Sequence, residues 1–139
     1  MIYAVALAKA MNIPTFTLFD GDADKPDKNG SRAMHQRENS ALLHVYGANS
    51  DDPMPATDYW GEGIVMWASD IGTVVKDDIG EDPWKSYQEK ADAQYGHAGN
   101  LRKNTLHIGA SLALAWDEGK KSTRLGRLCE EILRYAATV

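Results

Sequence analysis

Hydrophobic and polar positions alternate in blocks along the chain, and the spacing of apolar residues within each block predicts its secondary structure. Where apolar residues recur every three or four positions we expect a helix, and where β-branched and aromatic residues follow one another we expect a strand. The pattern predicts helices over residues 2–11, 31–46, 71–79, 83–95 and 105–118, a last helix around 125–136, and strands over 15–19 and 64–67. Ser69 is the expected N-cap of the helix over 71–79. The polar segment 47–63 contains two prolines and three glycines, so we expect it to be mostly loop.

The order of these elements predicts the class of fold. A helix that stops at Asn12, a tight turn and a short buried strand ahead of a group of acids form the αβ half of a parallel α/β unit. The second half of the chain is predicted to be mostly helical. Its last helix carries the clearest apolar stripe: Leu125, Leu128, Cys129, Ile132, Leu133 and Ala136. We find no internal repeat and no convincing linker, so we expect a single α/β domain over residues 1–139.

Composition narrows the setting in which the protein works. The chain has 139 residues and a net charge of −5, and a domain of this length needs no disulfide to fold. Its single cysteine cannot form an internal disulfide, no secretory signal is recognisable, and no apolar run is long enough to span a membrane. We therefore expect a cytoplasmic protein without a membrane partner. The negative charge argues against a module that binds nucleic acid by coating phosphates, although carboxylate-bound cations reverse the local charge.

Three aspartates at every second position, Asp20, Asp22 and Asp24, follow the first predicted strand. A parallel strand delivers the residues at its carboxyl end to the edge of the sheet where such folds place their sites. Asp20 and Asp22 point to the same side if the strand geometry persists, because side chains alternate with period two. Carboxylates held together in this way repel one another. A divalent cation such as Mg²⁺, which binds one or two protein carboxylates and several waters, relieves the repulsion.

Three other interpretations of the aspartates stay open. The first is a solvated acidic turn, in which Asp and Gly suit the tight backbone geometry. The second is a calcium loop, for which the chain has Lys25 where an EF-hand needs glycine and Ser31 where it needs glutamate. The third is a phosphatase of the haloacid-dehalogenase type with Asp20 as nucleophile and Asp22 as acid–base group. That pattern expects Thr or Val where Asp24 stands.

The wider context of the aspartates resembles a known nuclease family. The segments VALAKAMNIPTFTLFDGDADK, NSALLHVYG and RKNTLHIGASLALAWDEGK resemble, in their order and spacing, the TOPRIM domain of OLD-family ATP-dependent endonucleases. The resemblance runs through nearly the whole chain and implies a small, mainly parallel sheet flanked by helices. It also implies cleavage of DNA by a two-metal mechanism with Mg²⁺ or Mn²⁺, in which the ions activate the attacking water and stabilise the leaving oxygen.

The resemblance assigns roles to individual residues. It implies that Asp20 and Asp22 are catalytic metal ligands at the strand end. Asp24 would be a further metal ligand, or would accept hydrogen bonds from groups around the metal without contacting it. Asp70 would be a metal ligand at a position where the family usually has a glutamate. Lys103 matches a lysine expected to stabilise the charged phosphate in the transition state. The residues alone also allow other roles. Asp70 would be favourable at a helix N-terminus because of the helix dipole, and Lys103 could be a solvated charge in a loop.

Two parts of the family pattern have no counterpart in the sequence. The chain begins at the helix before the Asp-Gly-Asp strand, so the family's first strand with its glutamate is missing, and the sheet would be open at that position. No Gly-rich phosphate loop is found, so ATP would act through an absent ATPase domain. We therefore expect the C-terminal part of an OLD-type endonuclease, weakly active alone, with DNA and either that ATPase portion or further copies as partners. The alternative is a catalytically inactive TOPRIM-like interaction or regulatory domain.

Overall fold

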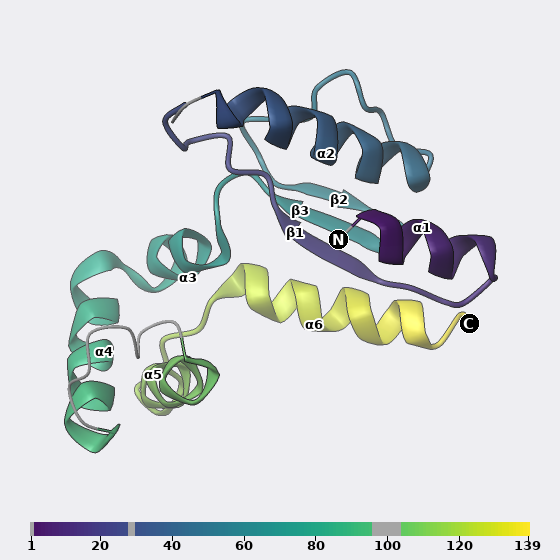
Figure 1. Cartoon of the computed structure of the whole chain (residues 1–139). Coiled ribbons are helices and arrows are strands. Elements are labelled where there is room, and N and C mark those ends of the chain that lie inside the picture. The colour runs from purple at the N-terminus through teal and green to yellow at the C-terminus, as the bar shows by residue number, and fades with distance from the viewer. Residues whose placement is uncertain (1, 28–29, 96–103) are drawn as a thin grey trace. The chain divides into compact units, whose positions relative to one another are not determined.

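The computed structural model describes residues 2–27, 30–95 and 104–139, and the chain divides into two compact units. The first unit comprises Met1–Ile71 and Leu128–Val139, and the second comprises Gly72–Arg127. The first unit holds α1 (Ile2–Ala10), β1 (Thr17–Asp20), α2 (Ser31–Val45), β2 (Tyr59–Gly61) and β3 (Ile64–Trp67), as Figure 1 shows. The second holds nearly all of α3 (Ile71–Ile79), α4 (Glu81–Tyr95), α5 (Thr105–Asp117) and the start of α6 (Thr123–Ala136), which continues into the first.

The first unit is built on a three-stranded sheet of order β1-β3-β2. β1 pairs with β3 in parallel, with Thr17 opposite Ile64 and Asp20 opposite Trp67, whereas β2 pairs with β3 antiparallel. The predicted α/β class is therefore confirmed. The sheet itself is mixed, with one parallel and one antiparallel pair, so the mainly parallel sheet that the sequence led us to expect is not confirmed. Among the described residues β1 forms one edge of this sheet.

Helices cover both faces of the sheet (Figure 1). α1 and α2 pack on one face, where the buried core consists of Val5, Phe19, Leu42, Leu43, Ile64 and Met66. On the other face Phe16 meets Tyr135 of α6 edge to face, and the Tyr135 hydroxyl accepts a hydrogen bond from the Thr15 N–H. Side chains of β3 alternate between the two faces, and all four of its residues are buried because both faces are covered.

Three helices end in the same local motif. A residue after the last turn takes a left-handed conformation, and its own amide and the next amide donate to carbonyls of that turn. Asn12 (φ 54°) ends α1 in this way, because its own amide donates to Lys9 and the Ile13 amide donates to Ala8. Gly47 and Gly119 do the same for α2 and α5. The predicted stop at Asn12 is confirmed.

The second unit is a group of helices around a core of its own. Its buried residues are Val75, Ile79, Trp84, Tyr87 and Ala115, with Leu112, Leu114 and Leu125 packed against them. α4 begins two residues before the predicted start at Pro83, which is tolerated in the first turn of a helix because an amide there has no partner within the helix. None of the described helices is long and apolar enough to cross a membrane.

The segment 47–63 is mostly loop, as predicted, but it also contains the short strand β2, which its proline and glycine content concealed. One local expectation is wrong. Ser69 is not the N-cap of α3, because the helix begins at Ile71 and the amide of Ile71 donates to the carboxylate of Asp20, 51 residues earlier in the chain. The first turn of α3 is therefore tied to the end of β1 by a tertiary contact.

Candidate functional site

Asp20 and Asp22 stand where β1 ends. Asp20 is the last residue of the strand, and the turn that follows stays hydrogen-bonded to the segment after β3. The amide of Gly21 donates to the Trp67 carbonyl at 2.7 Å, and the amide of Asp22 donates to the Ser69 carbonyl at 3.3 Å. Both carboxylates are thus held at the carboxyl end of the parallel β1–β3 pair, as the sequence predicts.

The backbone of this turn restricts which residues fit. A Cβ atom at Gly21 would lie 2.6 Å from the Trp67 carbonyl oxygen, far inside van der Waals contact, so the position requires glycine. Asp22 has a φ of 53°, in the left-handed region that Asp and Asn tolerate better than other residues with a Cβ atom. The backbone conformation of the turn therefore favours the Asp-Gly-Asp sequence, independently of any chemistry at the carboxylates.

The carboxylate of Asp20 is in an unfavourable electrostatic position. Loss of hydration raises the pKa of Asp20 above its ordinary value, and the nearby charges of Asp22 and Asp70 raise it further. The hydrogen bond from the Ile71 amide to Oδ1, at 3.2 Å, and the positive charge of Lys25 oppose that shift without cancelling it. Ionised Asp20 is therefore held close to other negative charges at a cost in free energy.

A cleft of about 190 Å³ adjoins the two aspartates. It is lined by Ile2, Phe19, Asp20, Asp22, His35, Glu38, Asn39 and Leu42. α2 brings His35 and Glu38 to this cleft, and neither was predicted as a site residue. Their spacing of three residues, continued to Leu42 four residues later, places them on one side of the helix, and this spacing is the signal in the sequence that could have identified them. His35 Nδ1 lies 3.7 Å from Asp22 Oδ2.

Asn39 is buried behind the cleft and holds two loops together. Its side-chain amide donates to the Gly21 carbonyl at 3.1 Å and to the Pro53 carbonyl at 3.0 Å. A buried amide group that serves two carbonyls from different segments fixes the turn between Asp20 and Asp22 relative to α2. The Asn of the NSALLHVYG segment is therefore a structural support of the site.

The other predicted site residues differ in their surroundings and do not all line the cleft beside Asp20 and Asp22. Asp70 is paired with Lys25, whose Nζ donates to Asp70 Oδ2 at 2.7 Å, and this hydrogen bond raises the pKa of Lys25. Asp24 is exposed and is not among the residues that line the cleft. Lys103 lies outside the described residues. Sequence analysis had given Lys25 no role at the site, and its proximity to Asp70 follows from the packing of the loop after β1 on the start of α3.

The described side chains show what such a site could hold. Among residues 2–27, 30–95 and 104–139, no group of three or more His, Cys, Asp or Glu residues is arranged to bind a metal ion. Asp20 and Asp22 are two carboxylates beside an open cleft, which corresponds to the way Mg²⁺ is held, by one or two carboxylates with water filling the remaining positions. The donor set therefore fits a hydrated hard cation better than a metal enclosed by protein ligands.

Comparison with protein-family models, with curated proteins and with solved structures gives no significant match for this chain.

Proposed function

We propose that the carboxyl end of β1 binds Mg²⁺ or Mn²⁺ and that the chain is a metal-dependent DNA endonuclease domain of OLD type, cleaving phosphodiester bonds. The observation that carries the proposal is the position of Asp20 and Asp22 at the carboxyl end of the parallel β1–β3 pair, beside a cleft that both residues line. Loss of hydration and the neighbouring charges of Asp22 and Asp70 raise the pKa of Asp20, which is consistent with a place for a cation. The resemblance to TOPRIM domains points to the same residues.

Each residue has a part in this proposal. Asp20 and Asp22 hold the cation, and Asp24 and Asp70 supply further oxygen ligands when a second ion and DNA are bound. Two cations held by these residues would supply activation of the attacking water and neutralisation of charge on the phosphate. Asp70 is paired with Lys25, so if Asp70 served as a metal ligand, the ammonium group of Lys25 would be available to pair with a phosphate oxygen. Lys103 is assigned the same electrostatic task by the resemblance.

The pairing of Lys25 with Asp70 also supports the alternative, a catalytically inactive interaction or regulatory domain with a TOPRIM-like fold. An ammonium group at 2.7 Å from Asp70 already neutralises part of the charge that a second ion would neutralise. Metal binding and DNA cleavage must therefore be measured separately.

Calorimetric titration with MnCl₂ and MgCl₂ tests the binding site. We expect the wild-type chain to bind the cation, and we expect the double variant Asp20→Asn/Asp22→Asn to lose measurable binding. The matched control is Asp51→Asn/Asp52→Asn, which removes the same charge from an exposed loop of the same unit and should bind as the wild type does. Equal binding by all three proteins would refute the site.

Nicking of supercoiled plasmid in Mn²⁺ tests the chemistry with the same three proteins. Cleavage by the wild type and the control, but not by Asp20→Asn/Asp22→Asn, supports the endonuclease. Cation binding without any cleavage, in the presence of excess Mn²⁺ and DNA, would favour the inactive interaction domain instead.

A further inference from the structure

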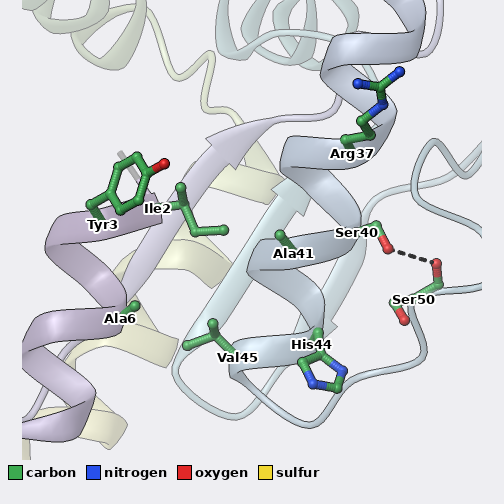
Figure 2. Close-up of a pocket in the computed structure, with 9 residues that line it drawn as sticks. All are labelled: Ile2, Tyr3, Ala6, Arg37, Ser40, Ala41, His44, Val45 and Ser50. Carbon is green, nitrogen blue, oxygen red and sulfur yellow. Dashed lines mark hydrogen bonds between the residues drawn. The ribbon is translucent and has the colours of Figure 1, made fainter.

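A second hollow of the first unit lies between α1 and α2, on the outer side of these helices. It is a groove of about 540 Å³, larger than the cleft at the aspartates. Figure 2 shows Ile2 and Ala6 of α1 facing Ala41 and Val45 of α2, with Arg37 and His44 on α2 at either end of the view. The hydrogen bond from Ser40 Oγ to the Ser50 carbonyl, at 3.3 Å, ties the following loop to the side of α2.

Further exposed apolar side chains lie on the two helices that form the groove. Tyr3, Leu7 and Met11 follow one another at intervals of four on α1 and its last turn, and 89%, 61% and 61% of their surfaces are exposed. On α2, Met34 precedes Arg37 by one turn and is 53% exposed. Residues spaced in this way lie on one side of a helix, and the α1 stripe extends over about 12 Å. An exposed apolar surface of this extent is typical of an interaction site.

Among the residues that line the groove, Arg37 is positively charged and His44 is basic, and none is a carboxylate, although the chain as a whole carries a net charge of −5 with histidines neutral. In the part of the chain that the structure describes, Arg37 makes no ion pair. Two copies docked through this face would bring basic side chains together without acidic partners, which disfavours a second copy of the chain as the occupant.

We propose that the α1–α2 groove is a docking site for an amphipathic α-helix of a partner protein, with an apolar stripe that enters the groove and acidic residues on its flank. The small side chains of Ala6 and Ala41 allow a helix about 10 Å wide to approach closely. Met34, one turn before Arg37 on α2, can adapt to its apolar residues. Acidic residues on the flank pair with Arg37 and, when it is protonated, with His44. This mode of recognition, a helix in a groove, needs no cation and is independent of the aspartates at β1.

A small molecule fits the same surface less well. Sites for small ligands normally enclose most of the ligand, whereas Tyr3 at the rim of this groove is almost wholly exposed and the apolar surface continues beyond it. A helix covers such an extended, open surface.

Fluorescence anisotropy with labelled designed peptides tests the proposal on the full chain. The probe is an amphipathic helical peptide with a leucine stripe flanked by glutamates; one comparison peptide has lysines in place of the glutamates, and another has the acidic composition in scrambled order. We expect saturable binding of the acidic peptide, weaker binding of the lysine peptide and no binding of the scrambled one. Equal binding of all three, or of none, would overturn the proposal.

Two variants locate the binding to the groove. Ala41→Glu places a charged side chain between the helices and should abolish binding of the acidic peptide. Arg37→Glu should reverse the preference, so that the lysine peptide binds more tightly than the acidic one, a result that a misfolded variant would not give. The matched control, Lys85→Glu on α4, makes the same change of charge at another exposed position and should behave as the wild type does.

Sedimentation at increasing protein concentration tests the competing occupant. We expect the wild type and Ala41→Glu to show the same state of association at every concentration. A dimer that forms in the wild type and is lost in Ala41→Glu would show that a second copy covers the groove, and it would overturn the proposal of an acidic partner helix.

Discussion

The carboxylate of Asp78 joins α3 to the start of α6 within the second unit, and its removal tests how that unit is held together. Asp78 Oδ2 accepts hydrogen bonds from the Ser122 hydroxyl at 2.7 Å and from the Arg124 amide at 2.9 Å. Oδ1 accepts from Arg124 Nε at 2.8 Å, and the same guanidinium donates to the Val74 carbonyl at 3.0 Å. Ser122 in turn accepts from the Leu125 amide, so that Asp78 and Ser122 together cap α6.

The size of the effect follows from the burial of this group. The Asp78 side chain is 10% exposed and that of Arg124 is 30% exposed, so the pair is partly screened by water. Hydrogen bonds to a charged group contribute about 1.5–3 kcal/mol each in mutational series, but they share one desolvation cost here. We expect Asp78→Ala to lower the free energy of unfolding by about 2–3 kcal/mol and Asp78→Asn by about 1–2 kcal/mol. Asparagine loses less because it keeps one oxygen acceptor.

Urea unfolding followed by circular dichroism measures this loss. Asp77→Asn is the matched control, because Asp77 is 55% exposed and lies 3.7 Å from Arg124; we expect a change below about 0.5 kcal/mol. Hydrogen exchange should also accelerate at the amides of Arg124 and Leu125 in Asp78→Ala. If Asp78→Ala and Asp77→Asn cost the same small amount, the carboxylate does not hold the two helices together.

The dependence on pH gives a second check. Burial raises the pKa of Asp78, but the hydrogen bonds from Ser122 and Arg124 and the guanidinium charge outweigh burial, so the pKa lies below its ordinary value. A lowered pKa in the folded state contributes stability above the unfolded value, near pH 4, which is lost as pH falls through the folded value. The difference in stability between the wild type and Asp78→Asn should therefore shrink as the pH falls below 4. A constant difference would contradict the role of the charge.

Two further predictions concern the first unit and a helix of the second. Gly21→Ala should lower the free energy of unfolding by about 1–3 kcal/mol, because the added Cβ would meet the Trp67 carbonyl. Gly109→Ala, inside α5 with no atom within 4 Å of the added Cβ, should raise the free energy of unfolding by about 1 kcal/mol. Thermal unfolding compares the two variants, and equal shifts would contradict the close approach at Gly21. Asp20→Asn should raise the urea midpoint at pH 7 without metal, because a carboxylate whose pKa is raised in the folded state favours folding only below about pH 4 and opposes it above. That gain should vanish at pH 3, and an equal gain at both values would refute the electrostatic explanation.

The sequence predicts most of the helices and the position of the aspartates, because these depend on local patterns. The helix stop at Asn12 and the strand 64–67 are both confirmed. Each of them follows from residues within a few positions of one another. The same holds for Asp20 and Asp22, because the end of β1 is marked by the change from apolar to acidic residues.

What the sequence could not predict depends on pairing between distant segments. β2 is a strand because three residues pair with β3 across a turn, in a segment whose composition is that of a loop. Asp20 takes the capping position of α3 that Ser69 was expected to fill. The apolar stripe of α6 correctly predicts a helix, yet Leu128 is buried while Ile132 and Leu133 remain 40% and 70% exposed. Periodicity shows that a helix has an apolar side without showing how much of that side is covered.

The left-handed backbone at Asp22 limits how position 22 can vary. Glycine, asparagine and aspartate accept a φ of 53° most readily, and among these three only aspartate carries a charge. In a library randomised at this position, selection for solubility alone should enrich all three residues. Selection for a cation-dependent activity should retain aspartate alone, so the ratio of asparagine to aspartate among survivors would report which constraint has acted on the turn.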